Sequence, residues 1–323
     1  MGRLLRGLGR WLLRTLLGLL VLAGGGLWWA HRAVDAERAP LPAVGDVATQ
    51  RPADDQPLRL SIINTASQPM ARAGVLDAER DPHGRAPYVM SHPSFVLEWA
   101  DGRILLIDAG MTPEQATAFG KPIQMIRDAQ AIEPHRSAAE ALGVDAARVR
   151  GVIFTHPHTD HTGGIAALCA AVGHDVTVFM TTAQAERPNY TTRPGLAQIR
   201  DATCARPVRL DGGPLMPVPG FPGVSVIDAG GHTPGSQIVV ADVGSGDVAR
   251  RYVFTGDIVN NADGIAYDLP KPWVYRTFIV PESDARQGEL RRFLKQLQDE
   301  AGATLLVSHD QLSLERSGVE AWR

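Results

Sequence analysis

The sequence predicts a layered α/β sandwich preceded by an N-terminal hydrophobic segment. From Leu58 onward, short runs rich in β-branched residues alternate with turn residues and with helical stretches. Strands occur in both halves of this region, with helices between and after them, which is typical of sheets covered by helices. At 323 residues, 44% of them apolar and 21% charged, the chain can form one large α/β domain or two small ones.

The first 31 residues are expected to form a signal anchor or a cleaved signal peptide. An apolar run without charge, residues 15–30, follows four arginines, Arg3, Arg6, Arg10 and Arg14. The run is shorter than the ~20 residues of a comfortable membrane span, so a buried core helix is the alternative. Its terminal position, the one-sided arginines and the pair Trp28 and Trp29, placed like an interfacial belt, favour the membrane segment. The positive-inside rule then leaves the remaining chain on the extracytoplasmic (periplasmic) side.

Residues 32–57 are rich in Ala, Pro, Asp and Arg without apolar periodicity, which predicts a linker. Residues 58–323 are expected to form the folded domain. Its two cysteines, Cys169 and Cys204, permit one disulfide in an oxidising compartment. Cys169 lies in an apolar stretch rich in alanine, and a buried free thiol is an equally acceptable interpretation.

The elements of this domain follow from local patterns. Turn residues 100–102 predict a hairpin between the second and third strands. The segment 187–222 is dense in Pro and Gly and is expected to consist of loops with short pieces of helix. The predicted strands are 58–63, 95–99, 103–107, 151–154, 176–180, 224–227, 237–241, 251–255 and 304–307. The predicted helices are 137–142, 146–148, 163–172 and, clearly amphipathic, 284–300.

The most informative segment is a histidine-rich loop directly after a predicted buried strand, where a rigid element favours an active site. Three imidazoles and a carboxylate so close together would repel one another if charged and would be costly if buried without partners. A divalent cation removes both problems, since zinc, iron and manganese all accept these ligands. The loop reads Thr155-His156-Pro157-His158-Thr159-Asp160-His161-Thr162-Gly163-Gly164.

Spacing within this loop favours two ions over one. His156 and His158 are two positions apart, so in an extended loop they project to the same side. Asp160 and His161 are adjacent and are expected to diverge. Because a mononuclear site needs about three protein ligands plus water, this loop alone oversupplies a single ion.

Three further donors stand just past other predicted strands, as His156 does. His232, Asp257 and His309 follow the strands 224–227, 251–255 and 304–307. We therefore expect them at the same site. The other five histidines lack this context and are expected to be ordinary surface or core residues: His31, His83, His92, His135 and His174.

These motifs together resemble the metallo-β-lactamase superfamily over about residues 58–310. The family signature His-x-His-x-Asp-His is matched by the loop, and the three later donors match in order and spacing. Residues 107–110, Ile-Asp-Ala-Gly, resemble the early Asp-x-Gly turn of that family. The resemblance implies the fold of the family, a four-layer αββα sandwich.

The resemblance also implies the role of each site residue. The first metal would be held by His156, His158 and His232, and the second by Asp160, His161 and His309. Asp257 would bridge both ions, and Asp108 would support the site from behind its ligands. Two divalent ions, most simply Zn²⁺, would then supply a bridging hydroxide that attacks a carbonyl, with Asp160 passing a proton to the leaving group.

Within the superfamily, the chain is most similar to the branch that opens N-acyl-homoserine lactones, and a lactone or other ester is the expected substrate. The similarity rests on residues 94–97, the Asp108 turn, residues 235–237 and the final Ser-His-Asp at 308–310. An aromatic segment would wall an acyl pocket or pack beneath a loop: Tyr267, Trp273, Tyr275 and Phe278. Tyr267 or Tyr190 is a candidate donor to a developing oxyanion.

Other functions stay open at this point. Asp257 argues against a β-lactamase, which is not expected to carry a bridging aspartate. The alternatives are a phosphodiester, thioester or β-lactam substrate, or a non-catalytic membrane-anchored metal-binding protein. The net charge of −3 and the lack of a basic stripe interleaved with aromatics argue against nucleic acid as a partner.

Overall fold

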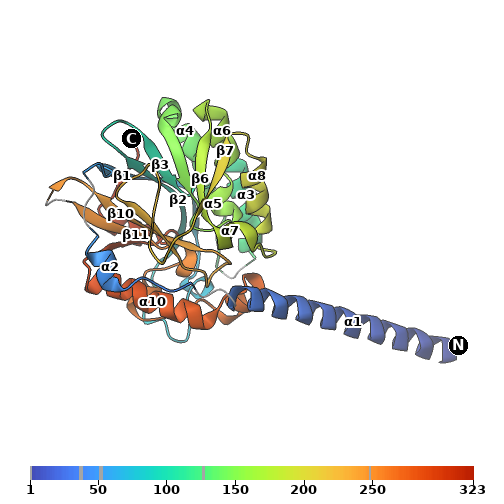
Figure 1. Ribbon diagram of the computed structural model, residues 1–323. Helices are drawn as coiled ribbons and strands as arrows, with labels where there is room; N and C mark the ends of the chain where they lie inside the picture. The colour runs from blue at the N-terminus through green and yellow to red at the C-terminus, as the bar shows by residue number, and fades with distance from the viewer. Residues whose placement is uncertain (1, 36–38, 51–53, 126–127, 247–248) are drawn as a thin grey trace.

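The computed structural model describes residues 2–35, 39–50, 54–125, 128–246 and 249–323. Two β-sheets pack face to face, and helices cover the outer face of each (Figure 1). The predicted four-layer αββα sandwich is thereby confirmed.

The helices are α1 (Gly2–Asp35), α2 (Val44–Ala48), α3 (Pro113–Ile123), α4 (Ala138–Leu142), α5 (Thr159–Thr162), α6 (Ile165–Val172), α7 (Thr182–Glu186), α8 (Arg193–Asp201), α9 (Asp263–Ala266), α10 (Asp284–Asp299) and α11 (Gln311–Arg316). Short 3₁₀ turns are η1 (Arg72–Gly74), η2 (Gly143–Arg148) and η4 (Gly256–Ile258), and η5 (Tyr275–Ile279) is a π-helical turn.

The first sheet combines an antiparallel half with a parallel half. Its order is β13-β1-β2-β3-β5-β6-β7, with β4 paired to β1. The parallel pairs β3–β5, β5–β6 and β6–β7 need crossover connections, and the helices α4, α6 and α8 lie along these connections. The strands are β1 (Arg59–Pro69), β2 (Val89–Glu98), β3 (Ile104–Ile107), β4 (Glu133–Pro134), β5 (Val149–Ile153), β6 (Val176–Thr181), β7 (Ala205–Leu210) and β13 (Glu320–Ala321).

The second sheet has the order β12-β11-β10-β9-β8 and is antiparallel except for the pair β11–β12. The long helix α10 packs on its outer face. The strands are β8 (Met216–Pro217), β9 (Val224–Asp228), β10 (Gln237–Val243), β11 (Arg250–Phe254) and β12 (Thr304–Leu306).

Three apolar clusters hold the four layers together. Between the sheets, Phe95 and Phe254 meet edge to face with ring centroids 4.9 Å apart, and both are fully buried. Ile165 and Leu168 of α6 pack on the first sheet, and Leu290 of α10 is buried on the second sheet. Burying side chains of this size contributes about 1.5–3 kcal/mol each, so both helical layers are fixed to their sheets.

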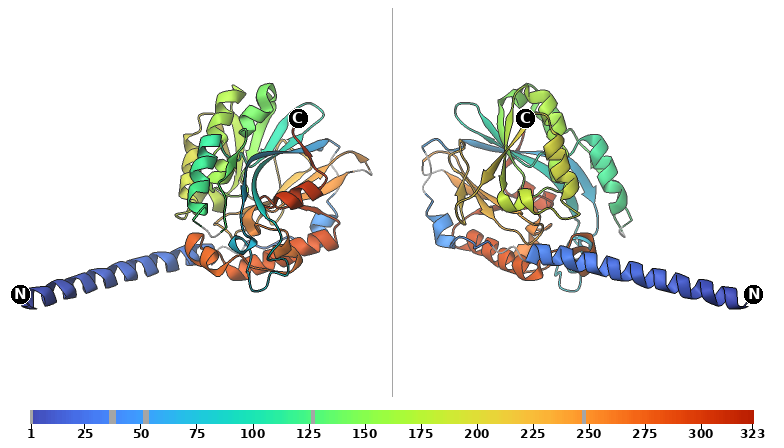
Figure 2. Two further views of the ribbon diagram at one scale, coloured as in Figure 1. Left: turned by 180° about the vertical axis from the view of Figure 1, so that it is seen from behind. Right: turned by 45° about the vertical axis from the view of Figure 1, so that its right-hand side comes forward.

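The N-terminal helix α1 projects away from the domain (Figure 2). Its stretch Gly9–Asp35 is long and apolar enough to cross a membrane, with a mean hydropathy of 1.5. The C-terminal end of α1 meets the domain: Ala30 and Val34 are buried, and the His31 ring nitrogens lie 3.2 and 3.1 Å from the carbonyl oxygens of Glu282 and Thr277. The side chains of Arg3 and Arg6 lie outside the described residues.

The segment predicted as a linker, 32–57, is packed against the domain where it is described. Helix α1 continues to Asp35, and Val47 of α2 is fully buried beside α10. Arg286 of α10 also donates a hydrogen bond to the Ala39 carbonyl (2.7 Å). Positions 36–38 and 51–53 of this segment lie outside the described residues.

Two further differences from the sequence-based expectation concern residues 163–210. The segment expected to hold only loops and short helices also contains β7, an edge strand whose exposed arginines and proline conceal the usual alternation. Cys169 and Cys204 form a disulfide with a Cα–Cα distance of 5.2 Å, which joins α6 to the turn before β7. The alternative of a buried free thiol at Cys169 is therefore wrong.

Candidate metal centre

The donors expected to hold metal come together at one end of the sandwich, between the two sheets. The loop that carries His156 leaves β5 of the first sheet, whereas His232, Asp257 and His309 follow β9, β11 and β12 of the second. Because each lies within a few residues of a strand end, the packing of the sheets sets their positions. All seven expected donors are brought together, although they span more than 150 residues of sequence.

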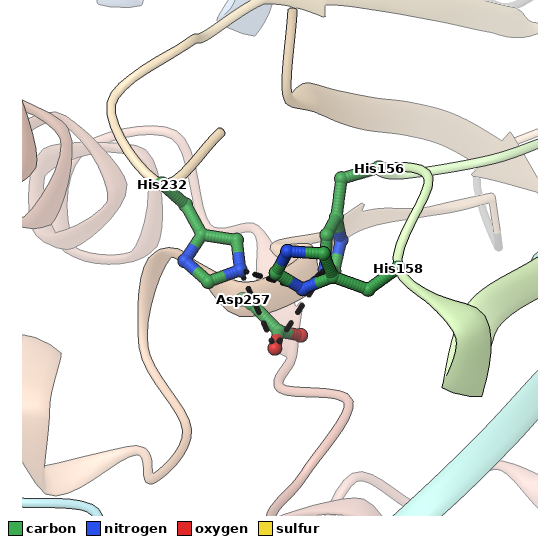
Figure 3. A group of neighbouring side chains, drawn as sticks. All are labelled: His156, His158, His232 and Asp257. Carbon is green, nitrogen blue, oxygen red and sulfur yellow. Dashed lines mark hydrogen bonds and ion pairs between the residues drawn. The ribbon is translucent and has the colours of Figure 1, made fainter. Parts of the chain in front are cut away.

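The first group consists of His156, His158, His232 and Asp257, whose side chains point toward a common centre (Figure 3). His158 Nδ1 lies 2.9 Å from His156 Nε2 and 3.4 Å from His232 Nε2. The Asp257 carboxylate lies 3.8 Å from His156 Nε2 and 3.7 Å from His232 Nε2. Three imidazole nitrogens and a carboxylate oxygen therefore face one another with no hydrophobic side chain between them.

The second group shares Asp257 with the first. His309 Nε2 lies 3.0 Å from Asp257 Oδ2, and His161 Nε2 lies 3.2 Å from Asp257 Oδ1. Asp160 Oδ2 stands 3.4 Å from His309 and 3.6 Å from His161. The expectation that the neighbours Asp160 and His161 diverge is wrong: from the single turn of α5, Asp160 Oδ2 and His161 Nε2 approach to 3.6 Å.

The chemistry of these groups fits divalent cations. His161 Nε2 and Asp257 Oδ1 are buried 3.2 Å apart, and neither makes a well-directed hydrogen bond to a described residue. Two carboxylates, Asp160 and Asp257, are buried in the same few ångströms, which is costly without a compensating positive charge. Imidazole nitrogen and carboxylate oxygen are the donors that zinc, iron and manganese accept.

Asp108 holds His161 and the start of the histidine loop. It accepts hydrogen bonds from His161 Nδ1 (2.8 Å) and from the Thr155 backbone N–H (2.8 Å). Asp108 has a φ of 59°, unusual for a residue with a side chain, and Gly110 also lies in the left-handed region. A Cβ at Gly110 would stand 2.4 Å from Thr65 Oγ1, so this turn requires a glycine there. The Asp108–Gly110 turn thus aims Nε2 of His161 at Asp257.

Sequence reasoning did not find Glu282 and Lys271, which lie behind His232. His232 Nδ1 donates to Glu282 Oε1 (2.6 Å), and Lys271 Nζ donates to the same oxygen (2.6 Å) and to the Asp257 carbonyl. All three side chains are buried. No motif signals them, because both residues lie in a proline-rich segment whose contact with His232 depends on tertiary packing.

His92, expected to be an ordinary surface or core histidine, is buried and lies beside these donors. Its Nδ1 lies 3.3 Å from Asp160 Oδ2, and its ring is 4.9 Å from that of His309. With Asp160 and His309 it forms a group whose donor atoms are close enough to hold an ion. His92 lies inside β2 and not past a strand end, which is why position in sequence did not identify it.

The two groups differ in the direction in which their surroundings shift the pKa values of their histidines. Burial and the neighbouring rings lower the pKa of His156, and burial and His232 lower that of His158 to about 3. Burial also acts on His161 and His309, but nearby carboxylates outweigh it and raise the pKa of both imidazoles. Asp108 is the main carboxylate for His161, and Asp257 for His309.

A pocket of about 420 Å³ opens beside both groups. His158, Asp160, Asp257 and His309 contribute to its wall, and the rest is mainly apolar: Met70, Val75, Met90, Phe119, Ile123, Tyr275, Ile279 and Val280. Within the described chain, no lysine or arginine lines it.

Of the aromatic residues considered from sequence, Tyr275 lies in the pocket wall. Tyr267 does not line the pocket, and the Tyr190 hydroxyl donates to the carbonyls of Phe278 and Ile279 (3.3 and 3.4 Å). Neither is therefore placed as an oxyanion donor in this structure.

Comparison with known proteins agrees with this geometry. The family model of the metallo-beta-lactamase superfamily matches residues 87–309. No sequence match was found among curated proteins.

Several solved structures share the fold. One is an N-acyl homoserine lactone hydrolase with the product N-hexanoyl-L-homoserine bound at its catalytic metal centre. It is 16% identical in sequence and superposes with a TM-score of 0.58, and the alignment covers 81% of this chain and 96% of that one. A probable metal-dependent hydrolase from Staphylococcus aureus is 14% identical with a TM-score of 0.56, covering 80% and 91%. AidC, a dizinc quorum-quenching lactonase, is 14% identical with a TM-score of 0.51, covering 79% and 90%.

The family model spans most of the chain and runs from just before β2 to the last expected ligand, His309. The architecture and the clustered histidines and aspartates are those of a metal-dependent enzyme. The chain therefore belongs to the metallo-β-lactamase superfamily and is a metal-dependent hydrolase.

Proposed function

We propose that the protein hydrolyses a lactone or another ester at a site for two divalent metal ions, most simply zinc. The first ion would be held by His156, His158 and His232, and the second by Asp160, His161 and His309, with Asp257 shared. The observation that carries this proposal is the position of Asp257, within 3.8 Å of histidine nitrogens from both groups.

Two divalent ions held by these residues would supply a water molecule of lowered pKa and a positive charge near the substrate carbonyl. The side chains of the protein hold and orient these groups. Asp108 accepts a hydrogen bond from the Nδ1–H of His161 and Glu282 from that of His232, which leaves Nε2 of each histidine directed at Asp257. Asp160 lies in the pocket wall, where its carboxylate can transfer a proton between the attacking water and the leaving oxygen.

The pocket supports a neutral substrate with an apolar part. Its walls are mainly aliphatic and aromatic, and the charged groups that line it are the aspartates and histidines of the two groups. A phosphodiester would have only the proposed ions, and no lysine or arginine of the described pocket wall, to pair with its negative charge. An acyl chain would instead bury apolar surface against Met70, Met90 and Ile279.

We also propose that residues 1–31 anchor the protein in a membrane, with residues 58–323 on the extracytoplasmic side. The length and apolar character of α1 support the anchor, and the arginines of the first 14 residues support the orientation. Residues 39–50 are packed on α10 and would belong to the catalytic part.

The test is metal content measured beside a hydrolysis screen, on the full chain in detergent. The panel would hold acyl-homoserine lactones, aryl esters, a thioester, a phosphodiester and a β-lactam. We expect about two ions per chain and chelator-sensitive turnover of a lactone or ester. Two ions with turnover of only the phosphodiester, thioester or β-lactam would overturn the substrate. Absence of bound metal would favour a non-catalytic protein.

A further inference from the structure

The backbone around His92 is shaped to aim this side chain. The register of β1 against β2 shifts between Asn64 and Ser67, opposite His92. Side chains replace the lost ladder bonds: the Asn64 carboxamide accepts the His92 N–H (2.9 Å), and the Thr65 hydroxyl donates to the His92 carbonyl (2.7 Å). Pro93 follows, a residue that strands tolerate at such irregularities. Bulges of this kind redirect side chains beside active sites.

The ring of His92 is buried, and only 1% of the residue is exposed. Neither ring nitrogen makes a well-directed hydrogen bond to a described residue, although Asp160 Oδ2 lies 3.3 Å from Nδ1. Leaving a buried polar group without a good hydrogen bond costs about 1–3 kcal/mol. Phe119 packs edge-on against the ring (5.1 Å between centroids) and limits its rotation away from Asp160.

We propose that His92 is an additional ligand of the second metal ion, which would then bind three imidazoles and two carboxylates. The proposal rests on the two-metal site described above. His92 Nδ1 lies 3.3 Å from Asp160 Oδ2, and the donor atoms of His92, Asp160 and His309 all lie within 4.8 Å of one another. A third imidazole shifts this site away from magnesium or manganese and toward zinc, iron or cobalt.

The test compares zinc affinities of the full-length wild type and His92→Phe by competition with a chromophoric chelator. We expect one ion to bind at least ~10-fold more weakly in the variant, with the other unchanged. His174→Phe, in the turn between α6 and β6, is the matched control and should bind both ions normally. Two ions bound with wild-type affinity by His92→Phe would overturn the proposal, whatever the substrate proves to be.

A second measurement covers the case in which His92→Phe does not fold. In cobalt-loaded wild type labelled with ¹⁵N-histidine, each metal-bound ring gives a hyperfine-shifted signal. The five histidines of the two groups together with His92 predict six such rings. Five rings would exclude His92 as a ligand.

A separate observation concerns residues 273–279, which we call the apolar rim. Trp273, Val274, Phe278 and Ile279 are each at least half exposed, although all are large and apolar. Ile279 also lines the pocket beside the metal groups. Exposed apolar patches of this kind mark contact surfaces.

The apolar rim lies against the base of α1, as both figures of the whole chain show. His31 contacts the carbonyl of Thr277 inside the rim. Trp28 and Trp29, 63% and 53% exposed, precede His31 by less than one helical turn, ~5.4 Å along the axis. Tryptophans of membrane helices lie at the level of the lipid headgroups. If α1 spans the bilayer, the rim lies at the same level.

We infer that the apolar rim inserts into the surface of the bilayer that holds α1, so that the pocket opens beside the membrane. The occupant is therefore lipid, and the substrate class of the proposed esterase would be one whose acyl chain dissolves in the membrane. The continuity of the rim with the base of α1 is what selects a bilayer over a protein partner.

The experiment places a spin label on Phe278→Cys or on Val144→Cys in full-length protein in phosphatidylcholine–phosphatidylglycerol vesicles. Cys169 and Cys204 form a disulfide, so the introduced thiol is the one to be labelled. Val144 is 92% exposed in η2, which directly follows α4, and α4 lies on the side of the domain away from α1 (Figure 1). We expect a label at 278 to collide with lipid-dissolved oxygen and to be shielded from a water-soluble nickel chelate, and the label at 144 to behave oppositely.

Equal exposure of both labels to the nickel chelate would overturn the inference, as would failure of the protein to associate with vesicles. Neither readout uses turnover. A failure of the proposed esterase activity is therefore distinguishable from a failure of the membrane contact.

Discussion

The two halves of the metal centre use the same residue types in opposite electrostatic surroundings. In the half formed by His156, His158 and His232, burial lowers the pKa values, helped by neighbouring imidazoles at His156 and His158 and by Lys271 at His232. In the half formed by His161 and His309, nearby carboxylates outweigh burial and raise the pKa values. The neighbours, and not the residue type, set the direction in which the pKa of a buried histidine shifts.

The halves also differ in how their histidines are oriented. His232 donates to Glu282, which Lys271 pairs, whereas His161 donates to Asp108 in a strained turn of the backbone. A separate carboxylate, Glu282 or Asp108, therefore orients one histidine of each half, and Asp257 is the residue that contacts both halves.

The largest effect is expected from Asp257→Asn, which removes the negative charge shared by both halves. Turnover should fall at least ~100-fold and one ion should be lost, because a neutral amide cannot bridge two cations. Metal analysis, steady-state kinetics and circular dichroism would measure this. Full activity with both ions retained would contradict the role of a shared ligand.

A smaller and selective effect is expected from the two supporting carboxylates. Glu282→Gln should weaken the ion of the first half, and Asp108→Asn that of the second, each by ~10–100-fold. Chelator competition on both variants measures this, and each is the control for the other. If both substitutions weakened the same ion, the halves would not be independently supported.

Glu282→Gln also leaves Lys271 buried without its carboxylate, which can cost ~3–5 kcal/mol of stability. The double variant Lys271→Met/Glu282→Gln removes both charges and separates orientation from stability. Selective loss of the first ion in this double variant would retain the assignment even if the single variant folds poorly.

The smallest effect is expected at Asp228, which ends β9 at the start of the loop that carries His232. Its Oδ1 is buried without a hydrogen-bond partner in the described chain, and burial raises its pKa from 3.8 to about 6. The folded state therefore binds this proton more tightly than the unfolded state, and stability falls as the pH rises from about 4 to about 6.

Asp228→Asn should remove this pH-dependent loss of stability. The variant should be roughly 1–3 kcal/mol more stable than wild type above pH ~7, with the difference disappearing below pH ~4. Denaturant unfolding at both pH values measures it. A stability difference that does not change with pH would show that the pKa of Asp228 is not raised by burial, because a partner stabilises its charged form.

The donors that lie along one short stretch of chain were identifiable from residue type and spacing. The histidine loop follows a buried strand, and residues 156–161 necessarily lie within a few ångströms of one another. The layered α/β architecture also followed from local patterns, because apolar runs separated by turn residues report which segments are buried. Strand β7 was missed because its exposed edge carries arginines in place of alternating apolar residues.

Residues that reach the site from elsewhere were not identifiable in this way. His92 lies in the middle of a strand, and the only local irregularity beside its contact with Asp160 is the bulge between Asn64 and Ser67 of the neighbouring strand. Glu282 and Lys271 lie in a proline-rich segment with no periodicity that could place it behind His232. The pairing of Cys169 with Cys204 likewise depended on the approach of α6 to β7.

The sequence by itself determined the ligand chemistry, the sandwich and the apolar character of the N-terminal helix, because these depend on residue type and short-range spacing. Only the tertiary structure decided that the seven donors gather at one end of the sandwich, that His92 lies beside Asp160 and His309, and that the rim of the pocket meets the base of α1. These depend on contacts between distant segments, which are set by how sheets and helices pack and not by local pattern.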